Sequence, residues 1–222
     1  MGAGDPVAHT GPVGTRRWWE ERALPRLTHR TCQGTDVDRW RRPMCAEARG
    51  VVLDVGFGSG PNLEHYPAAV TRVLAAEPSQ LAWELAAGRI AAFGRPVERT
   101  ARDAADLTAL PDGSVDTVTA AWALCTVPDV GRALAEVRRV LRPGGSLLFV
   151  EHSRAPDRGT ERAQRWVQPL WGRVAGGCHL DRDLPLVIER TGFEVELDRA
   201  AYIGPGPVRV WGWFVRGAAR PT

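Results

Sequence analysis

The sequence predicts a doubly wound α/β protein, and three observations support this prediction. Residues 51–55 (VVLDV) form a nearly continuous apolar run, which is typical of a parallel strand covered on both faces. A turn containing Gly56, Gly58 and Gly60 follows, and Pro61 is placed to open a helix. Farther along, strand-like apolar runs alternate with helical patterns, which indicates βα units around a parallel sheet.

A second strand is expected over residues 73–77 (VLAAE), and it ends in an acid. Pro78 and Ser79 then break the strand and cap a helix, which fixes Glu77 at the carboxyl edge of the sheet. A doubly wound fold presents a carboxylate to a ribose diol at about this distance from the glycine turn. Glu77 is therefore the candidate ribose ligand, and the alternative is a solvated acid at a strand end.

The other elements follow from apolar periodicity and from turn residues. The expected strands lie around residues 96–101, within 112–128, over 147–150, and near 193–200 and 208–215. The expected helices cover residues 129–141, ended by the PGG of residues 143–145, and a segment that runs through Leu186 and Ile188 to Gly192.

The glycine turn favours S-adenosylmethionine (SAM) over a dinucleotide. The third glycine of a GxGxxG loop would fall at position 61, which is Pro61, so the pattern is GxGxG. Asp54 precedes the first glycine by two residues, where its charge would repel a pyrophosphate but suits the ammonium and sulfonium of SAM. After the third strand, Asp103 can accept a hydrogen bond from an adenine amino group beside the small Ala104.

Four segments in order resemble the motifs of class I SAM-dependent methyltransferases: VLDVGFGSG, the acid Glu77, LPDGSVDTVTAAWALCTVPD and LRPGGSLLFVEH. The resemblance covers residues 49–152. It implies a Rossmann-like seven-stranded sheet with an antiparallel last strand, SAM as the cofactor and S-adenosylhomocysteine as its product. The cofactor-binding residues expected on this basis are Asp54, Gly56, Phe57, Gly58, Gly60, Glu77, Pro78, Asp103, Ala104 and Trp122.

Shorter segments narrow the resemblance. NLEHYP, LCTVP, VEH and GCHLDR resemble the methyltransferase-like thiol S-methyltransferases and their bacterial relatives. The ubiquinone and menaquinone C-methyltransferases share the core blocks, but they look less like this chain in the GCHLDR segment. The animal thiol methyltransferases carry a hydrophobic N-terminal anchor that this chain is not expected to share.

His152 and Asp181 are the candidate catalytic residues. His152 emerges at the end of the fifth strand, and an ordinary histidine pKa of about 6.5 suits proton removal at neutral pH; a packing role is the alternative. Asp181 either orients the acceptor or caps the next helix. Cys125 is expected to be a small buried residue beside SAM. No metal site is predicted, because the spacing of Cys178, His179 and Asp181 matches no standard ligand set.

The chain is expected to contain a disordered tail over residues 1–15 and one methyltransferase domain over residues 16–222. Within the domain, residues 16–49 form a helical lid, 50–152 the SAM-binding core, and 153–222 the substrate-side helices and final strands. Trp18, Trp19 and Trp40 either close the lid or pack on the sheet. Trp166 and Trp171 suggest an aromatic acceptor pocket.

Composition limits the remaining possibilities. The net charge of +3 is spread along the chain without a basic stripe, so nucleic acid is not an expected partner. The four cysteines lie far apart with no CxxC pair, which suits a reducing cytoplasm. Neither a signal peptide nor a membrane anchor is expected, and the protein is predicted to be a monomer or homodimer.

Three functions fit these observations. The first is S-methylation of a small apolar thiol, for detoxification or natural-product tailoring. The second is O- or C-methylation of a phenol or quinol, which needs a clearer base. The third is a non-catalytic module that binds SAM without turning it over.

Overall fold

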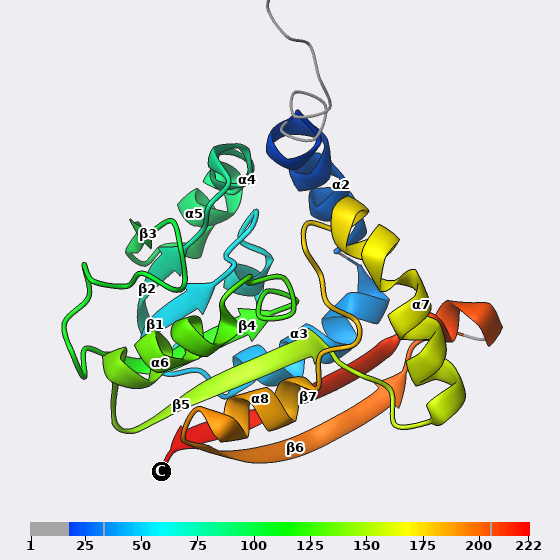
Figure 1. Cartoon of the computed structure of the whole chain (residues 1–222). Coiled ribbons are helices and arrows are strands. Elements are labelled where there is room, and N and C mark those ends of the chain that lie inside the picture. Colours follow the sequence, from blue (N-terminus) through cyan, green and yellow to red (C-terminus); the bar gives the residue numbers. More distant parts are fainter. Residues whose placement is uncertain (1–17, 33, 205) are drawn as a thin grey trace, which may run out of the picture.

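Seven strands form one mixed sheet in the order β3-β2-β1-β4-β5-β7-β6 (Figure 1). The first five strands are parallel, and β7 is antiparallel to both of its neighbours. This arrangement confirms the predicted doubly wound fold with an antiparallel last strand. The strands are β1 (Gly50–Val55), β2 (Val70–Ala76), β3 (Val97–Ala101), β4 (Val115–Ala121), β5 (Leu141–His152), β6 (Phe193–Tyr202) and β7 (Trp213–Pro221).

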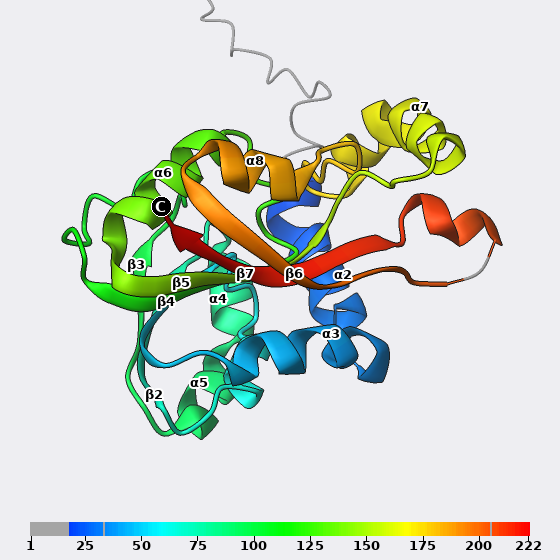
Figure 2. The ribbon, with the colours of Figure 1, turned by 90° about the horizontal axis from the view of Figure 1, so that it is seen from below.

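Helices cover both faces of this sheet, with α6 and α8 on one face and α3 and α5 on the other (Figure 2). The computed structural model describes residues 18–32, 34–204 and 206–222, so the tail predicted over residues 1–15 lies outside the described residues. The helices and turns are η1 (Trp19–Ala23), α2 (Leu24–Thr31), α3 (Thr35–Ala46), η2 (Pro61–Glu64), α4 (Gln80–Leu85), α5 (Ala87–Phe93), α6 (Val130–Val140), α7 (Arg158–Val174), α8 (Leu184–Arg190) and η3 (Gly206–Val210).

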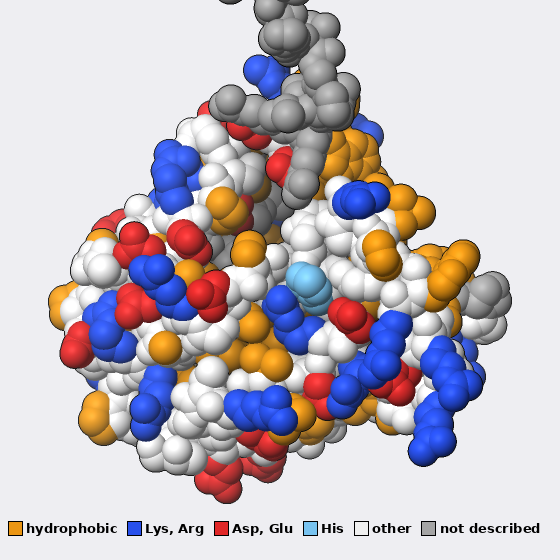
Figure 3. All heavy atoms as spheres, viewed as in Figure 1, with side chains coloured by type: hydrophobic (Ala, Val, Ile, Leu, Met, Phe, Trp, Pro, Cys, Tyr) orange, Lys and Arg blue, Asp and Glu red, His pale blue; other side chains and the backbone are white. Residues whose placement is uncertain are grey.

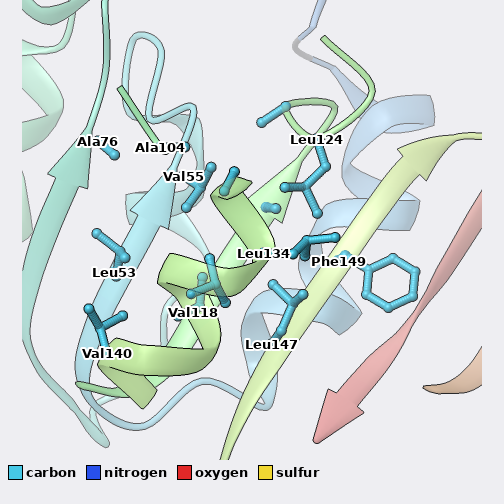
Figure 4. Packing of buried hydrophobic residues seen from close by; sticks show 14 of the residues in the cluster. Leu53, Val55, Ala76, Ala104, Val118, Leu124, Leu134, Val140, Leu147 and Phe149 are labelled. Carbon is cyan, nitrogen blue, oxygen red and sulfur yellow. The ribbon is translucent and has the colours of Figure 1, made fainter. Parts of the chain in front are cut away.

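The apolar side chains of each strand divide between two cores. Leu53 and Val55 of β1 pack under α6, where they meet Leu134 and Val140 (Figure 4). Val52, one position along β1, points to the opposite face and joins the core beneath α3. This alternation with a period of two is why a buried parallel strand is apolar almost throughout. Both faces are thereby excluded from water, and the strand ends are left to carry polar groups.

Two predicted boundaries differ from the structure. β5 begins at Leu141 rather than after the PGG segment, because the register with β4 is interrupted between Val115 and Thr117 and the strand continues through the irregularity. β7 begins at Trp213 rather than near residue 208, because Gly206–Val210 form a 3-10 turn. The positive φ angles of Gly204 and Gly206 turn the chain there.

The N-terminal helices differ in where they pack: α3 lies on the sheet, whereas η1 and α2 lie against α4, and His29 of α2 is 2.8 Å from the Ser59 hydroxyl in the loop after β1. Trp40 of α3 is 2% exposed and meets Phe214 of β7 edge to face at 5.7 Å, so it belongs to the core and not to a lid. Trp18 is exposed, and the Trp19 indole donates to the Val174 carbonyl at the end of α7. This bond ties the start of the described chain to α7.

Helix α7 has an apolar outer side. Trp166, Leu170 and Val174 recur every four residues and are all exposed, as is Leu27 of the neighbouring α2. Hydrophobic side chains accordingly gather on the side of the molecule where α2 and α7 lie (Figure 3). In the part of the chain that the structure describes, no helix has both the length and the apolar character needed to cross a membrane.

Candidate cofactor and acceptor site

The loop after β1 takes a conformation that glycine permits and other residues resist. Gly56, Gly58 and Gly60 have φ angles of 70°, 58° and 74°, all in the left-handed region. At Gly56 an added Cβ would also lie 2.4 Å from the Cβ of Ala123, in the loop after β4. The glycine loop therefore lies directly against the end of β4, at the point where the strand order reverses and doubly wound folds bind ligands.

Glu77 lies beside this loop, as its position after β2 predicted. Its carboxylate accepts hydrogen bonds from the backbone N–H groups of Gly58 and Ser79, both at 2.7 Å. Burial raises its pKa, and the two N–H donors oppose that rise. Each carboxylate oxygen retains a lone pair for an outside donor such as a ribose hydroxyl. Ser79 also caps α4 by accepting from the Ala82 N–H, as predicted.

Asp54 lies beneath the loop. Its carboxylate is fully buried and accepts from the Asn62 amide at 2.9 and 3.1 Å and from the Thr119 hydroxyl at 3.1 Å. Burial raises its pKa to about 7. Asp54 therefore fixes the base of the loop through Asn62, and its predicted influence on a bound cation would act through the field rather than by contact.

The other predicted cofactor residues differ in how they are placed. Phe57 is buried against Trp83 at 5.3 Å between ring centroids, so its ring faces inward. Pro78 and Asp103 are exposed at the ends of β2 and β3, and Asp103 accepts from the Ala105 N–H. Ala104 is buried. These four positions remain predictions as ligand contacts.

Trp122 provides the test of whether the site suits a cofactor. It is the one non-glycine residue with a positive φ among the described residues, at 54°. Its indole N–H is buried without a hydrogen-bond partner in the described chain, and the residue directly follows β4, one residue before the Ala123 that meets the glycine loop. A strained residue that holds an unpaired buried donor is typical of a ligand site. The glycine loop, Glu77 and Trp122 together fit the polar end of SAM and its ribose.

Three potential ligand atoms meet beyond the end of β4, where the sequence predicted no metal site. The Sγ atoms of Cys125 and Cys178 lie 3.7 Å apart, and each lies 3.7 Å from Nδ1 of His152. Both sulfur atoms are buried, whereas His152 is partly exposed. The prediction of Cys125 as a buried residue is confirmed, but its neighbours are a second cysteine and a histidine.

The two thiols of this cluster differ in acidity. Hydrogen bonding from Cys125, and then the contact with His152, lowers the pKa of Cys178. The same pairing, together with burial, raises the pKa of Cys125. The Cys178 sulfur is thus the favoured place for a thiolate in the buried pair.

Glu151 positions the loop that bears Cys125. Its fully buried carboxylate accepts from the backbone N–H groups of Ala123, Leu124 and Cys125 at 2.8 to 3.2 Å. Arg182 holds the same loop from the other side by donating to the carbonyl of Leu124 at 2.7 Å. Neither role was predicted, although an acid at the end of the apolar run LLFVEH is a signal for such a buried anchor.

The two predicted catalytic residues, His152 and Asp181, have different surroundings. Nδ1 of His152 faces the two sulfurs, and its ring packs edge to face on Phe214 at 4.6 Å. Asp181 is partly exposed, 3.8 Å from Nδ1 of His179. The helix cap is Asp183, which accepts from the Leu186 N–H, so capping does not account for Asp181.

Aromatic side chains line this part of the site. The rings of Trp171 and Trp211 pack together at 5.8 Å between centroids, beside the buried Cys125, Cys178 and Leu180. The Trp211 indole N–H is buried without a partner among the residues described, whereas the Trp171 indole contributes a hydrogen bond that helps to lower the pKa of Cys178. Trp166 is 84% exposed and does not take part in the aromatic pocket predicted for it.

A separate hollow at the opposite edge of the sheet is not the candidate site. It is lined by arginines of α6 and β7 and by the PGG segment, near the start of β5. Doubly wound folds bind ligands at the carboxyl ends of their strands, and this hollow lies at an amino end.

The chain is similar to methyltransferases in both sequence and fold. Residues 53–149 match the family model for a methyltransferase domain. The matched family and the order of the strands are those of class I SAM-dependent methyltransferases, so the chain has their fold. The chain is 33% identical over 161 residues to the thiol S-methyltransferase TMT1B of Homo sapiens, and the match covers 69% of this chain and 64% of that protein. It is 38% identical over 123 residues to the demethylmenaquinone methyltransferase of Renibacterium salmoninarum, which covers 52% of this chain and 48% of that protein.

The chain covers less than two thirds of the length of these curated relatives. Solved structures show the same fold. A SAM-dependent methyltransferase of Thermotoga maritima, described as a possible histamine N-methyltransferase, superposes with a TM-score of 0.59 at 22% identity over 95% of this chain and 96% of its own. A SAM-dependent methyltransferase of Mesorhizobium loti gives 0.60 at 20% identity over 84% and 98%.

Proposed function

We propose that this protein transfers the methyl group of SAM to the thiol sulfur of a small apolar molecule. The observation that supports SAM use is the carboxylate of Glu77 bonded to the left-handed glycine loop. Thiol acceptors are supported by the identity of 33 to 34% to thiol S-methyltransferases over about two thirds of the chain.

The chemistry requires alignment more than proton transfer. The sulfonium of SAM supplies an activated methyl carbon, and an acceptor thiolate attacks it while the carbon–sulfonium bond breaks. Sulfonium and thiolate become two neutral sulfides, so an apolar environment favours the transition state over the separated ions. The tryptophans that line the site, Trp171 and Trp211, provide such an environment and exclude water.

His152 and Asp181 are the groups proposed to act on the acceptor. His152 lies at the end of β5, within 3.7 Å of two sulfurs, and is partly exposed. In this proposal it receives the thiol proton, and Asp181 orients the acceptor from the GCHLDR segment. A free thiol with a pKa of about 8.5 is only slightly ionised near neutral pH, so the acceptor gains from a group that removes its proton.

Methylation of a quinol or phenol is the second candidate. It is favoured by the similarity to demethylmenaquinone methyltransferases at 35 to 38% identity over shorter stretches. Those relatives cover about half of this chain, whereas the thiol methyltransferases cover about two thirds.

The test is S-adenosylhomocysteine formation with matched acceptors. Thiophenol and phenol form one matched pair, because they differ only in having sulfur or oxygen as the acceptor atom. Further pairs of thiols and hydroxy-aromatic compounds are assayed in the same way from pH 6 to 9. Turnover confined to the thiols supports the proposal. Turnover confined to phenols or quinols replaces it with the second candidate, and SAM binding without turnover of either panel identifies a binding module.

A further inference from the structure

The cluster of Cys125, His152 and Cys178 draws its members from three distant segments. Cys125 follows β4, His152 ends β5, and Cys178 precedes α8. Their three ligand atoms form a triangle with sides of 3.7 Å. Two soft sulfur donors with one imidazole nitrogen make a ligand set that suits zinc.

The dimensions of the triangle match those of a zinc site. Zinc binds sulfur at about 2.3 Å and nitrogen at about 2.0 to 2.1 Å, so a tetrahedron places its sulfurs about 3.8 Å apart and its sulfur and nitrogen about 3.5 Å apart. The cluster therefore forms one face of such a tetrahedron with almost no rearrangement. A fourth position is left for a ligand from outside the chain, as in catalytic zinc sites with three protein ligands.

Backbone hydrogen bonds hold the segments that bear the cluster in place, whether or not a metal is bound. The His179 N–H donates to the Cys125 carbonyl at 2.8 Å, so the segments that bear the two cysteines cross in direct contact. Gly177, with a φ of 85°, makes this approach possible, because an added Cβ would lie 3.2 Å from the Thr126 carbonyl oxygen. Glu151 anchors the N–H of Cys125 from beneath. The sulfurs are thus positioned by bonds that do not depend on the thiols themselves.

The surroundings of the cluster also resemble a metal site. Leu180, Trp171 and Trp211 enclose the sulfurs in an apolar shell. His152 is the partly exposed member, which gives the cluster one side that an outside molecule can reach. The loop with Cys125 begins at Ala123, which touches the glycine loop, so the cluster borders the cofactor position.

We propose that Cys125, His152 and Cys178 bind a zinc ion whose fourth ligand is the thiolate of the methyl acceptor. The identity of that fourth ligand rests on the proposed function. On binding, the acceptor thiol releases its proton to solvent and forms a sulfur–zinc bond. The bound sulfur keeps a lone pair that attacks the methyl carbon of SAM while the bond from that carbon to the sulfonium sulfur breaks, and S-adenosylhomocysteine leaves as a neutral sulfide. The product thioether, a weaker ligand, then leaves the metal. In this scheme His152 is a metal ligand through Nδ1 and no longer the base that receives the thiol proton, because the metal itself favours the thiolate.

The first experiment measures metal binding without turnover. Full-length reduced protein is stripped with a chelator and titrated with cobalt(II), which replaces zinc and absorbs strongly when bound by thiolates in a tetrahedral site. We expect one equivalent to bind, and zinc to displace it. Cys125→Ser, Cys178→Ser and His152→Gln should each weaken binding by about tenfold or more, whereas Cys32→Ser, in a cysteine outside the cluster, should not.

A second measurement tests the fourth ligand with SAM omitted. Thiophenol added to the cobalt form should change the thiolate-to-cobalt absorption, and phenol should not. Circular dichroism confirms that each variant remains folded, and the serine variants differ from the native protein by one atom. A reduced native protein that binds no cobalt or zinc, or variants that bind as well as it does, would overturn the zinc site. Cobalt binding without a response to thiophenol would overturn the acceptor's role as ligand.

These outcomes are distinguishable from failure of the proposed function. Thiol turnover by a protein that binds no metal would reject the zinc site and leave S-methylation standing. A metal that binds thiophenol in a protein that never methylates thiols would leave the zinc site standing and reject the proposed function.

Discussion

Glu77 joins the two halves of the cofactor loop with one carboxylate. It connects the N–H of Gly58 to that of Ser79 at the end of β2. Glu77→Gln keeps the size of the side chain but removes the charge that strengthens hydrogen bonds to a ribose. We expect SAM affinity to fall about 10- to 100-fold, since a hydrogen bond to a charged group contributes about 1.5 to 3 kcal/mol. Calorimetric titration measures this change.

The matched control is Glu98→Gln, on the exposed side of β3. It should leave SAM affinity unchanged. Equal affinity in the Glu77 variant and the native protein would remove Glu77 from the ribose site.

Asp54 gives the apo protein a pH-dependent stability. Its pKa is raised to about 7 by burial, against about 3.9 in an unfolded chain. Between these values the folded state holds a proton that the unfolded state has lost, so this contribution is full below about pH 4 and is lost as the pH rises through about 7. Asn62, Thr119, Tyr66 and Arg41 face the carboxylate and limit the rise.

Asp54→Asn should therefore flatten the decline of the free energy of unfolding between pH 5 and 7. The difference is on the order of 1 to 3 kcal/mol, and urea unfolding at several pH values measures it. Asp36→Asn, in an exposed side chain, is the control. A slope as steep in the Asp54 variant as in the native protein would contradict the assignment.

At the scale of elements, the contact of the glycine loop with β4 can be separated from backbone strain. Gly56 and Gly94 have nearly equal φ angles of 70° and 69°, but only Gly56 has a neighbour that an added Cβ would strike. Gly94→Ala should cost about 1 to 2 kcal/mol of stability through strain alone. Gly56→Ala should cost a further 1 to 3 kcal/mol or so through overpacking against Ala123.

Urea unfolding of both variants measures the difference. Adding Ala123→Gly to Gly56→Ala should return the cost toward that of Gly94→Ala, because the opposing methyl group is removed. If Gly56→Ala and Gly94→Ala are equally stable, the loop does not depend on its contact with β4.

The sequence predicted the elements that bury an unbroken apolar pattern. Residues 51–55 and the helix near 129–141 were placed to within a few residues, because burial on both faces or on one stripe leaves a direct signal. The starts of β5 and β7 were misplaced, since pairing with a neighbouring strand continued β5 through a glycine-rich segment. The pairing involves strands that are far apart in the sequence, so a local pattern does not reveal it.

The candidate site likewise has a part that local sequence patterns predict and a part that they do not. The glycine loop and Glu77 are adjacent to strands and follow from local pattern. Cys125 and Cys178 are 53 residues apart, and their contact depends on how the segment before α8 returns across the end of β4. The spacing of the two cysteines along the chain does not reveal this tertiary contact, so the cluster could not be predicted from the sequence.

For the molecule as a whole, Arg41 connects the N-terminal helices to the cofactor core. Its guanidinium is 1% exposed and donates to the Asn62 amide oxygen, to Asp38 and to the carbonyl of Cys32. Asn62 in turn holds Asp54. In Arg41→Lys a single ammonium group replaces the three nitrogen atoms of the guanidinium and cannot donate to all three acceptors. We expect the free energy of unfolding to fall by about 2 to 4 kcal/mol, because buried acceptors lose their donors.

Urea unfolding tests this loss, with the neighbouring and exposed Arg42→Lys as the control. Arg42→Lys should change the free energy of unfolding by less than about 0.5 kcal/mol. Equal stability of the two variants would mean that the helices are held by apolar packing alone.

The place of β7 between β5 and β6 has a consequence for biosynthesis. On the ribosome β5 emerges well before Trp213–Pro221, so its outer edge has no partner until that last strand appears. At about 5 to 20 residues per second, the interval from His152 to Pro221 lasts on the order of 3 to 14 seconds. During it the nascent chain carries an open strand edge that invites pairing with other chains, so early chaperone contact should centre on β5.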